Sequence, residues 1–125
     1  MPGTLIRLAG EFAVCRLGPT EPVPGWVGES GFVSVTRTDD ELSILCPAAD
    51  VPATVRQERG WRLLKLQGTF AFTETGVLLR ILRPLAAAHV GILALSTFDT
   101  DYVAVKGAEL TRAEEALVSA GYLLR

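Results

Sequence analysis

The residues able to do chemistry are few in this 125-residue chain, and their spacing forms no catalytic centre. The single histidine, His89, precedes Val90-Gly91, where a helix is expected to end, so it suits a partner of the helix dipole better than a general base. Ser34 and Ser96 have no base or acid at triad-like spacing, and the chain contains no G-x-S-x-G elbow. The glycines between Gly18 and Gly31 lack the Lys-Ser/Thr of a phosphate loop. We therefore expect no catalytic residue and no enzyme.

The other groups that could hold a metal or a cofactor are also scattered. Cys15 and Cys46 have no C-x-x-C pair and no histidine near them. This favours two reduced thiols inside strands, with a disulfide or a metal site as the alternatives. The acidic pairs Asp39-Asp40 and Glu114-Glu115 suit a turn and a solvated helix face. We expect no metal and no cofactor.

Composition narrows the class of protein. Hydrophobic residues make up 49% and charged residues 21%, which is typical of a packed globular domain. The formal net charge is −2 and the lysines and arginines form no basic stripe, which argues against nucleic acid as a partner. The most apolar stretch, Leu85 to Leu95, is shorter than the about 20 residues that span a bilayer, and Glu11 interrupts any signal-like core. The expected location is the cytoplasm, away from membranes.

Parts of the sequence recur. Leu8 to Val14 resembles Leu66 to Phe72, Gly31 to Leu42 resembles Gly91 to Tyr102, and Leu63 to Lys65 resembles Leu123 to Arg125. The offset is 58 in the first block and 60 afterwards. Such self-similarity predicts two copies of one unit, residues 1–62 and 63–125. Because units this small are marginal alone, we expect them to share a core or an extended sheet.

The second half predicts alternating strands and helices. Trp61 to Phe72 is extended, with Gly68 at a bulge or at the seam between the copies. A helix follows, with an apolar stripe at helical spacing, Thr73 or Thr75 as its cap and a bend at Pro84; the stripe is Val77, Leu78, Ile81, Leu82 and Leu85. The remaining elements are a hairpin, a helix opened by a capping box and a last strand, at Ile92 to Thr97 with Tyr102 to Lys106, Thr111 to Ala120, and Tyr122 to Leu124. The order βαββαβ is ferredoxin-like.

The first half predicts a degenerate version of the same unit. Its short β-prone runs are Phe12 to Leu17, Phe32 to Thr36 and Leu42 to Cys46. Three prolines between Gly18 and Trp26 exclude a regular helix there, and Asp50 to Arg59 suits a short irregular helix. The predicted fold class is α+β: two fused ferredoxin-like units with antiparallel sheets and helices on one face.

Gly76 at the start of a helix and Ser96-Thr97-Phe98-Asp99-Thr100-Asp101-Tyr102 across a central hairpin resemble the ACT domain. The segments from Ser34 to Ile44 and from Gly76 through Pro84-Leu85-Ala86 to Gly91-Ile92 resemble the branch of small tandem ACT proteins related to the arginine-sensing CASTOR proteins. The resemblance implies a regulatory, ligand-binding protein. Those relatives have four units in one chain, whereas this chain suggests two.

The resemblance also implies a ligand site that holds an amino acid or similar metabolite between two segments. One is Glu74, Thr75, Gly76 and Val77, and the other is Thr97, Phe98 and Asp101. Free amides at a helix start accept a carboxylate, and carboxylates accept an ammonium or guanidinium group, while an aromatic ring covers the stem.

Simpler roles stay open for the same residues: a turn for Asp99 and Asp101, packing for Gly76, a subunit contact for Phe98. The main hypothesis is an amino-acid sensor that forms a homodimer and contacts a protein partner. The alternatives are an assembly module without a ligand, or an enzyme accessory subunit that offers a sheet edge to its partner.

Overall fold

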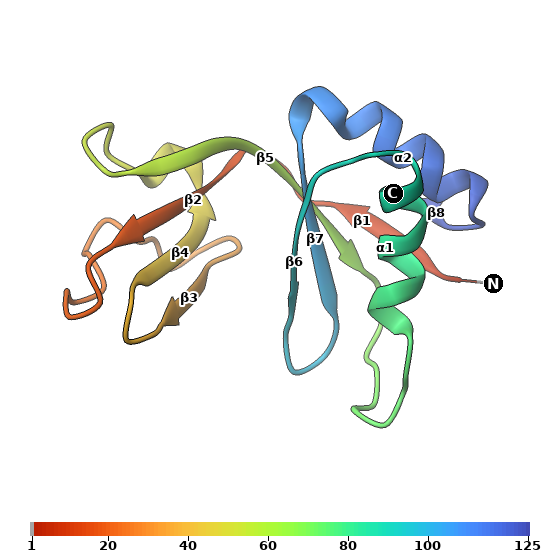
Figure 1. Cartoon of the computed structure of the whole chain (residues 1–125), viewed down its shortest axis with the longest axis horizontal. Helices are drawn as coiled ribbons and strands as arrows, with labels where there is room; N and C mark the ends of the chain where they lie inside the picture. Colours follow the sequence, from red (N-terminus) through yellow and green to blue (C-terminus); the bar gives the residue numbers. More distant parts are fainter. Residues whose placement is uncertain (1) are drawn as a thin grey trace. The chain divides into compact units, whose positions relative to one another are not determined.

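The computed structural model describes residues 2–125, and the chain divides into two compact units. The helical unit comprises the residues up to Ala9 together with Arg62–Arg125, and the inserted unit comprises Gly10–Trp61. Figure 1 colours both along the chain, from red to blue. The expected units 1–62 and 63–125 differ from these in the residues before Gly10 and at Arg62. Those residues belong with the second half because the strand β1 (Thr4–Arg7) pairs there.

The helical unit contains the expected βαββαβ order. It runs through the second part of β5 (Gln57–Leu66), α1 (Val77–Ala87), β6 (Ile92–Ser96), β7 (Asp101–Lys106), α2 (Leu110–Ser119) and β8 (Leu123–Leu124). A short 3-10 turn, η2 (Gly107–Glu109), precedes α2. The extended run ends at Leu66, earlier than predicted, and Gly68 follows it with a left-handed φ of 118°.

The sheet of the helical unit has the strand order β6-β7-β5-β1-β8. β1 runs antiparallel to β5, with Leu5 opposite Leu66, and parallel to β8, with Thr4 opposite Leu123. The sequence analysis did not predict β1. β1, which comes before the βαββαβ unit in the sequence, therefore lies in the interior of the sheet, between β5 and β8.

Both helices pack on one face of this sheet, as predicted (Figure 1). Ile81 and Leu85 of α1 and Leu117 of α2 are 0% exposed. They rest on alternate residues of the central strands, namely Leu64, Leu66, Val103 and Val105. Burying each large aliphatic side chain contributes about 1.5–3 kcal/mol, so this interface stabilises the unit.

The helix starts differ from the predictions. Neither Thr73 nor Thr75 caps α1, because the cap position is Gly76 and no side-chain bond is formed there. The predicted capping box at Thr111 is also wrong: α2 begins at Leu110, and η2 leads the chain into it. Pro84 lies within α1, where a bend stays a prediction.

The inserted unit consists of strands and loops. β2 (Phe12–Leu17), β3 (Ser34–Arg37), β4 (Leu42–Pro47) and the first part of β5 lie in the order β3-β4-β2-β5. Residues 10–61 contain no α-helix, only the 3-10 turn η1 (Ala48–Asp50). Instead, the proline-rich loop of residues 18–33 lays Trp26, Val27 and Val33 over the buried face of the sheet. A loop thus covers this face of the sheet, and no regular helix forms from Gly18 to Trp26, as expected.

Two predictions about the first half are wrong. Asp50 to Arg59 is not a short helix, because β5 already begins at Gln57 and pairs with β2 through Val14 opposite Glu58. The first block of the repeat is not equivalent in structure either. Phe12 begins a strand, whereas Phe70, its partner in the repeat, lies outside any strand.

Candidate functional site

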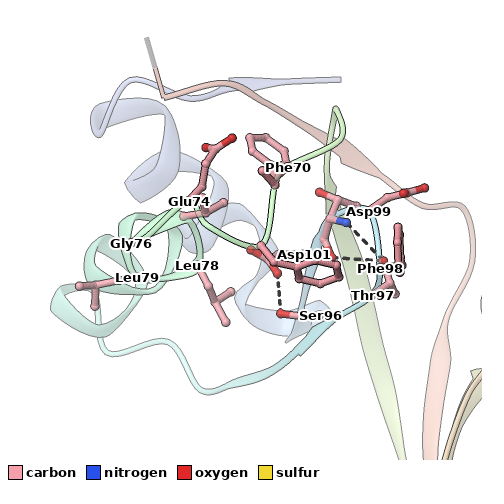
Figure 2. A pocket seen from close by; sticks show the side chains of 14 residues that line it. Phe70, Glu74, Gly76, Leu78, Leu79, Ser96, Thr97, Phe98, Asp99 and Asp101 are labelled. Atoms are coloured by element: carbon pink, nitrogen blue, oxygen red, sulfur yellow. Dashed lines mark hydrogen bonds between the residues drawn. The ribbon is translucent and has the colours of Figure 1, made fainter.

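A cleft of about 410 Å³ lies at the start of α1 in the helical unit. Three segments line it: the loop from Phe70 to Gly76, the first turn of α1, and the hairpin turn between β6 and β7. Figure 2 shows this hairpin cleft, with Gly76 and Glu74 on one side and Thr97, Phe98 and Asp101 on the other. All the lining residues belong to one compact unit, so the site is built within a single body.

Gly76 forms the helix side of the cleft. Its φ of 76° is left-handed, which a residue with a Cβ adopts only at a cost. The N–H of Arg80 donates to the carbonyl of Gly76 at 3.0 Å, so the helical ladder begins here. The amides of Val77, Leu78 and Leu79 precede the first helical donor and face no helical acceptor. Three lining residues therefore present N–H groups at the positive end of the helix dipole.

The hairpin side is held by a four-residue turn. The N–H and the hydroxyl of Thr97 both donate to the carbonyl of Thr100, at 2.8 and 3.2 Å. The hydroxyl of Thr100, only 5% exposed, donates to the carbonyl of Leu66 at 2.7 Å. The N–H of Phe70 donates to the carbonyl of Asp99 at 2.8 Å, which ties the loop to the turn. The two walls of the cleft are therefore joined.

Asp101 is positioned by its neighbour across the hairpin. The two residues Ser96 and Asp101 pair in register, and the Ser96 hydroxyl donates to the Asp101 carboxylate at 2.5 Å (Figure 2). Asp101 alternates with Val103 and Val105, which pack under the helices, so it lies on the helix-covered face of β7. In the sequence, Ser96 begins the hairpin segment that resembles the ACT domain, but it was not among the expected ligand-binding residues. Its role in the structure is to orient a carboxylate.

The lining of the hairpin cleft is acidic and aromatic. Glu74, Asp99 and Asp101 contribute three carboxylates, and no lysine, arginine or histidine lines the cleft. Phe72 and Phe98 meet edge to face with ring centroids 5.1 Å apart, and they are 77% and 79% exposed. Such an arrangement attracts a cation, which the carboxylates pair with and the ring faces can cover.

Buried thiols in the inserted unit do not form a reactive centre. Cys15 and Cys46 are free and buried in β2 and β4. Burial raises the pKa of Cys46 to about 12 and also raises the pKa of Cys15. Both therefore stay protonated at neutral pH, when only the thiolate is a good nucleophile. Across residues 2–125, no cluster of three or more His, Cys, Asp or Glu side chains is arranged to hold a metal ion.

The helical unit matches a known family. The model of the ACT domain matches residues 56–119. This chain belongs to the ACT domain family. The N-terminal domain model of a second family matches residues 10–54, within the inserted unit. A comparison with curated proteins gives no match.

Solved structures share the fold along nearly the whole chain. A protein of Agrobacterium tumefaciens is 43% identical with a TM-score of 0.92, over 98% of this chain and 91% of that one. A Vibrio cholerae protein described as of unknown function and a possible transport protein is 15% identical, with a TM-score of 0.70 over 94% and 88%. The aspartate kinase of Clostridium acetobutylicum is 12% identical, with a TM-score of 0.67 over 93% of this chain and 34% of the kinase. At identities this low, the last two show the ACT-type fold alone.

The ACT unit brings together most of the residues that the resemblance named. Six of them line the hairpin cleft: Glu74, Gly76, Val77, Thr97, Phe98 and Asp101. Thr75 does not; its carbonyl accepts a hydrogen bond from Arg80 at 3.4 Å. Eight further lining residues were not predicted as ligand-binding: Phe70, Ala71, Phe72, Leu78, Leu79, Ser96, Asp99 and Thr100. Their proximity to the two named segments was the available signal, since each lies within four residues of one of them.

No helix within residues 2–125 combines the length and apolar character needed to cross a membrane.

Proposed function

We propose that this ACT protein is a non-enzymatic regulatory module that binds an amino acid or similar small metabolite in the hairpin cleft. The observation that carries the proposal is the pairing of opposite polarities across one cavity. Free amides of the first turn of α1 lie on one side, and the oriented Asp101 carboxylate lies on the other. The volume of about 410 Å³ falls within the range of about 300–1,000 Å³ that is typical of small-molecule sites.

The polarity of the cleft sets the orientation of a bound amino acid. Its carboxylate accepts hydrogen bonds from the amides of Val77, Leu78 and Leu79, because helix N-termini stabilise anions. Its cationic groups form ion pairs with the carboxylates of Asp101 and Glu74. The absence of any basic side chain in the lining favours a ligand with a positively charged side chain. Charge-assisted bonds contribute about 1.5–3 kcal/mol each, enough together for micromolar to millimolar affinity.

Membership of the ACT family supports the regulatory role, because ACT domains commonly bind such ligands and regulate other proteins. The fold shared with an aspartate kinase, described as an allosteric enzyme, is consistent with it. We further propose that the inserted unit is a second, degenerate ACT-type unit, as in the small tandem branch with CASTOR relatives. We also propose that the protein acts as a cytoplasmic homodimer whose packing changes with the ligand.

A second candidate function is protein assembly without a ligand. The exposure of Phe72 and Phe98 favours it, since large exposed aromatic side chains often mark contact surfaces. Under this alternative, Phe98→Ser lowers the oligomeric state in sedimentation and leaves amino-acid binding undetectable in both proteins.

The decisive test is a thermal-denaturation screen of the whole chain against each of the twenty amino acids. A ligand at 100 times its Kd adds about 2.7 kcal/mol to the free energy of unfolding, which corresponds to a rise in Tm on the order of 10 °C. Asp101→Asn removes the charge while keeping the shape, and should abolish the shift. Asp39→Asn, in the turn of the inserted unit, is the matched control. No shift with any amino acid contradicts ligand binding and favours assembly.

A further inference from the structure

A second hollow, of about 260 Å³, lies on the other face of the ACT sheet. Lys65 lines it and stands between Leu64 and Leu66, both of which pack under the helices. Because side chains alternate along a strand, Lys65 points to the face that the helices do not cover. Ile6 lies opposite it on β1, and Tyr102 of β7 forms another wall. This Lys65 hollow is thus distinct from the hairpin cleft, which Lys65 does not line.

Lys65 forms no ion pair within the described part of the chain, although one carboxylate, that of Asp99, lines the same hollow. Arg7, Arg59 and Arg112 form ion pairs with glutamates in that part of the chain. Lys65 is half-buried. A partly desolvated ammonium group without a counter-ion is costly, and a bound anion would offset that cost.

Further hydrogen-bond donors gather beside Lys65. Gln67 and Thr69 line the same hollow with an amide and a hydroxyl. Gly68 between them has a left-handed φ of 118°, which turns the chain sharply. Among the described residues, the N–H groups of Gly68 and Thr69 donate to no backbone carbonyl. A cation and several uncommitted donors in one concave site are what an oxyanion requires.

We propose that the Lys65 hollow binds a small oxyanion, either a phosphoryl or a carboxylate group, through the Lys65 ammonium group and the Gly68-Thr69 amides. The site lies behind the hairpin turn, and Thr97, Asp99 and Thr100 contribute to both hollows. In Figure 2 the Asp99 carboxylate points away from α1, as expected of a residue shared with the rear face. The proposal does not depend on amino-acid binding in the hairpin cleft.

The chain offers a clean experiment because Lys65 and Lys106 are its only lysines. In protein with carbon-13-labelled lysine, the side-chain NMR signals of the two are followed during titration with inorganic phosphate and, separately, with acetate, at constant ionic strength. We expect the Lys65 signal to shift and saturate with one or both anions, while Lys106 stays nearly unchanged. Saturation by phosphate alone identifies a phosphoryl site, and saturation by acetate alone identifies a carboxylate site.

Two variants separate binding from folding, and the Gly68 and Thr69 amide signals supply the readout in both. Lys65→Gln should weaken anion binding at least about ten-fold because it removes a charge-assisted hydrogen bond, and Lys65→Arg should retain most of the affinity. Unchanged thermal unfolding of each variant shows that the fold persists. Small, linear shifts of both lysines, or saturation that survives Lys65→Gln, would overturn the proposal. Neither result bears on Asp101, so the hairpin cleft is tested independently.

Discussion

The two β-hairpins of the chain close with the same turn and differ at the next residue. In the inserted unit, the N–H of Thr38 donates to the carbonyl of Glu41 at 2.9 Å; in the ACT unit, the N–H of Thr97 donates to Thr100 at 2.8 Å. The following strand then begins with Leu42 in one and Asp101 in the other. Each strand leads directly into a 3-10 turn, so the two segments correspond at an offset of 59.

This difference distinguishes a core position from a site position. Leu42 is 0% exposed and packs with Ile44 and Cys46 on the covered face of its sheet. Asp101 occupies the same place before Val103 and Val105, yet it lines a cavity and accepts a bond from Ser96. A position that one unit uses for packing holds a charged group in the other. If Asp101 serves a ligand, an apolar residue at this position should make the protein more stable, because functional residues often cost stability.

Exchanging the core residue for the site residue should have the largest effect. Leu42→Asp removes a fully buried side chain and introduces a charge without a partner, so we expect a loss of about 4 kcal/mol or more in the free energy of unfolding. Urea denaturation followed by circular dichroism measures it. A loss below about 1 kcal/mol would show that Leu42 is not a core position.

The start of α1 has no counterpart in the inserted unit, because residues 10–61 contain no α-helix. Gly76→Ala places a Cβ on a left-handed residue, 3.3 Å from the Arg80 guanidinium, and should cost about 1–2 kcal/mol. Gly25→Ala, in the loop of the inserted unit, meets no atom within 4 Å and should change stability little. Equal effects of the two changes in chemical denaturation would contradict a special role for Gly76.

The turn of the ACT unit is anchored more deeply than the other. Thr100→Val keeps the volume but removes the buried bond to the Leu66 carbonyl, for an expected loss of about 1 kcal/mol. Thr38→Val in the exposed turn of the inserted unit should lose about half as much. The comparison is made by thermal unfolding at one pH. A larger loss of stability for Thr38→Val would show that the turn of the inserted unit is the more firmly anchored of the two.

Making the site resemble the core should stabilise the protein. Asp101→Leu completes an apolar row with Val103 and Val105, so we expect a gain of about 0.5–1 kcal/mol together with the loss of any amino-acid response. Calorimetry with and without ligand reports both. Destabilisation by this change would indicate that Asp101 has a structural role.

Alkaline pH should affect stability through the buried thiols, with no effect at neutrality. The pKa of Cys46 is about 12 in the folded protein, above its ordinary value near 9. The unfolded chain therefore loses this proton first, and stability falls as pH rises from about 9 towards 12. Cys46→Ala should reduce that slope when unfolding is measured between pH 8 and 11. An unchanged slope of stability against pH would show that a group other than Cys46 causes the loss.

The elements whose signal lies in neighbouring residues could be predicted from the sequence. The stripe from Val77 to Leu85 predicted α1. The hairpin was also predicted, but its turn was expected at Phe98 to Asp101, one residue later than the observed turn from Thr97 to Thr100. The cleft residues followed from the family resemblance, since neither Glu74 nor Asp101 forms a motif alone. Physical reasoning supplied their chemistry, but their proximity depends on the fold.

The features that the sequence did not predict depend on pairing between strands far apart in the chain. Asp50 and Pro52 look like a helix start, yet the pairing of β5 with β2 extends the chain from Gln57 onward. Thr4–Arg7 carries little strand signal, because its partners Leu66 and Leu123 lie at least about sixty residues away. The Lys65 hollow was missed for the same reason. A lone lysine within an apolar run indicates a site only when its neighbours from β1 and β7 are in place.

The position of β1 has a consequence for the order in which the protein is made. This strand is synthesised before both of its neighbours: β5 follows after the inserted unit, and β8 follows after nearly the whole ACT unit. β1 therefore stays unpaired while the inserted unit is synthesised, and after pairing with β5 it still has one open edge until β8 is made. Thr4–Arg7 is thus made early and completes its pairing late. A slow step in translation before β5 would lengthen the time for which that strand is exposed to other chains.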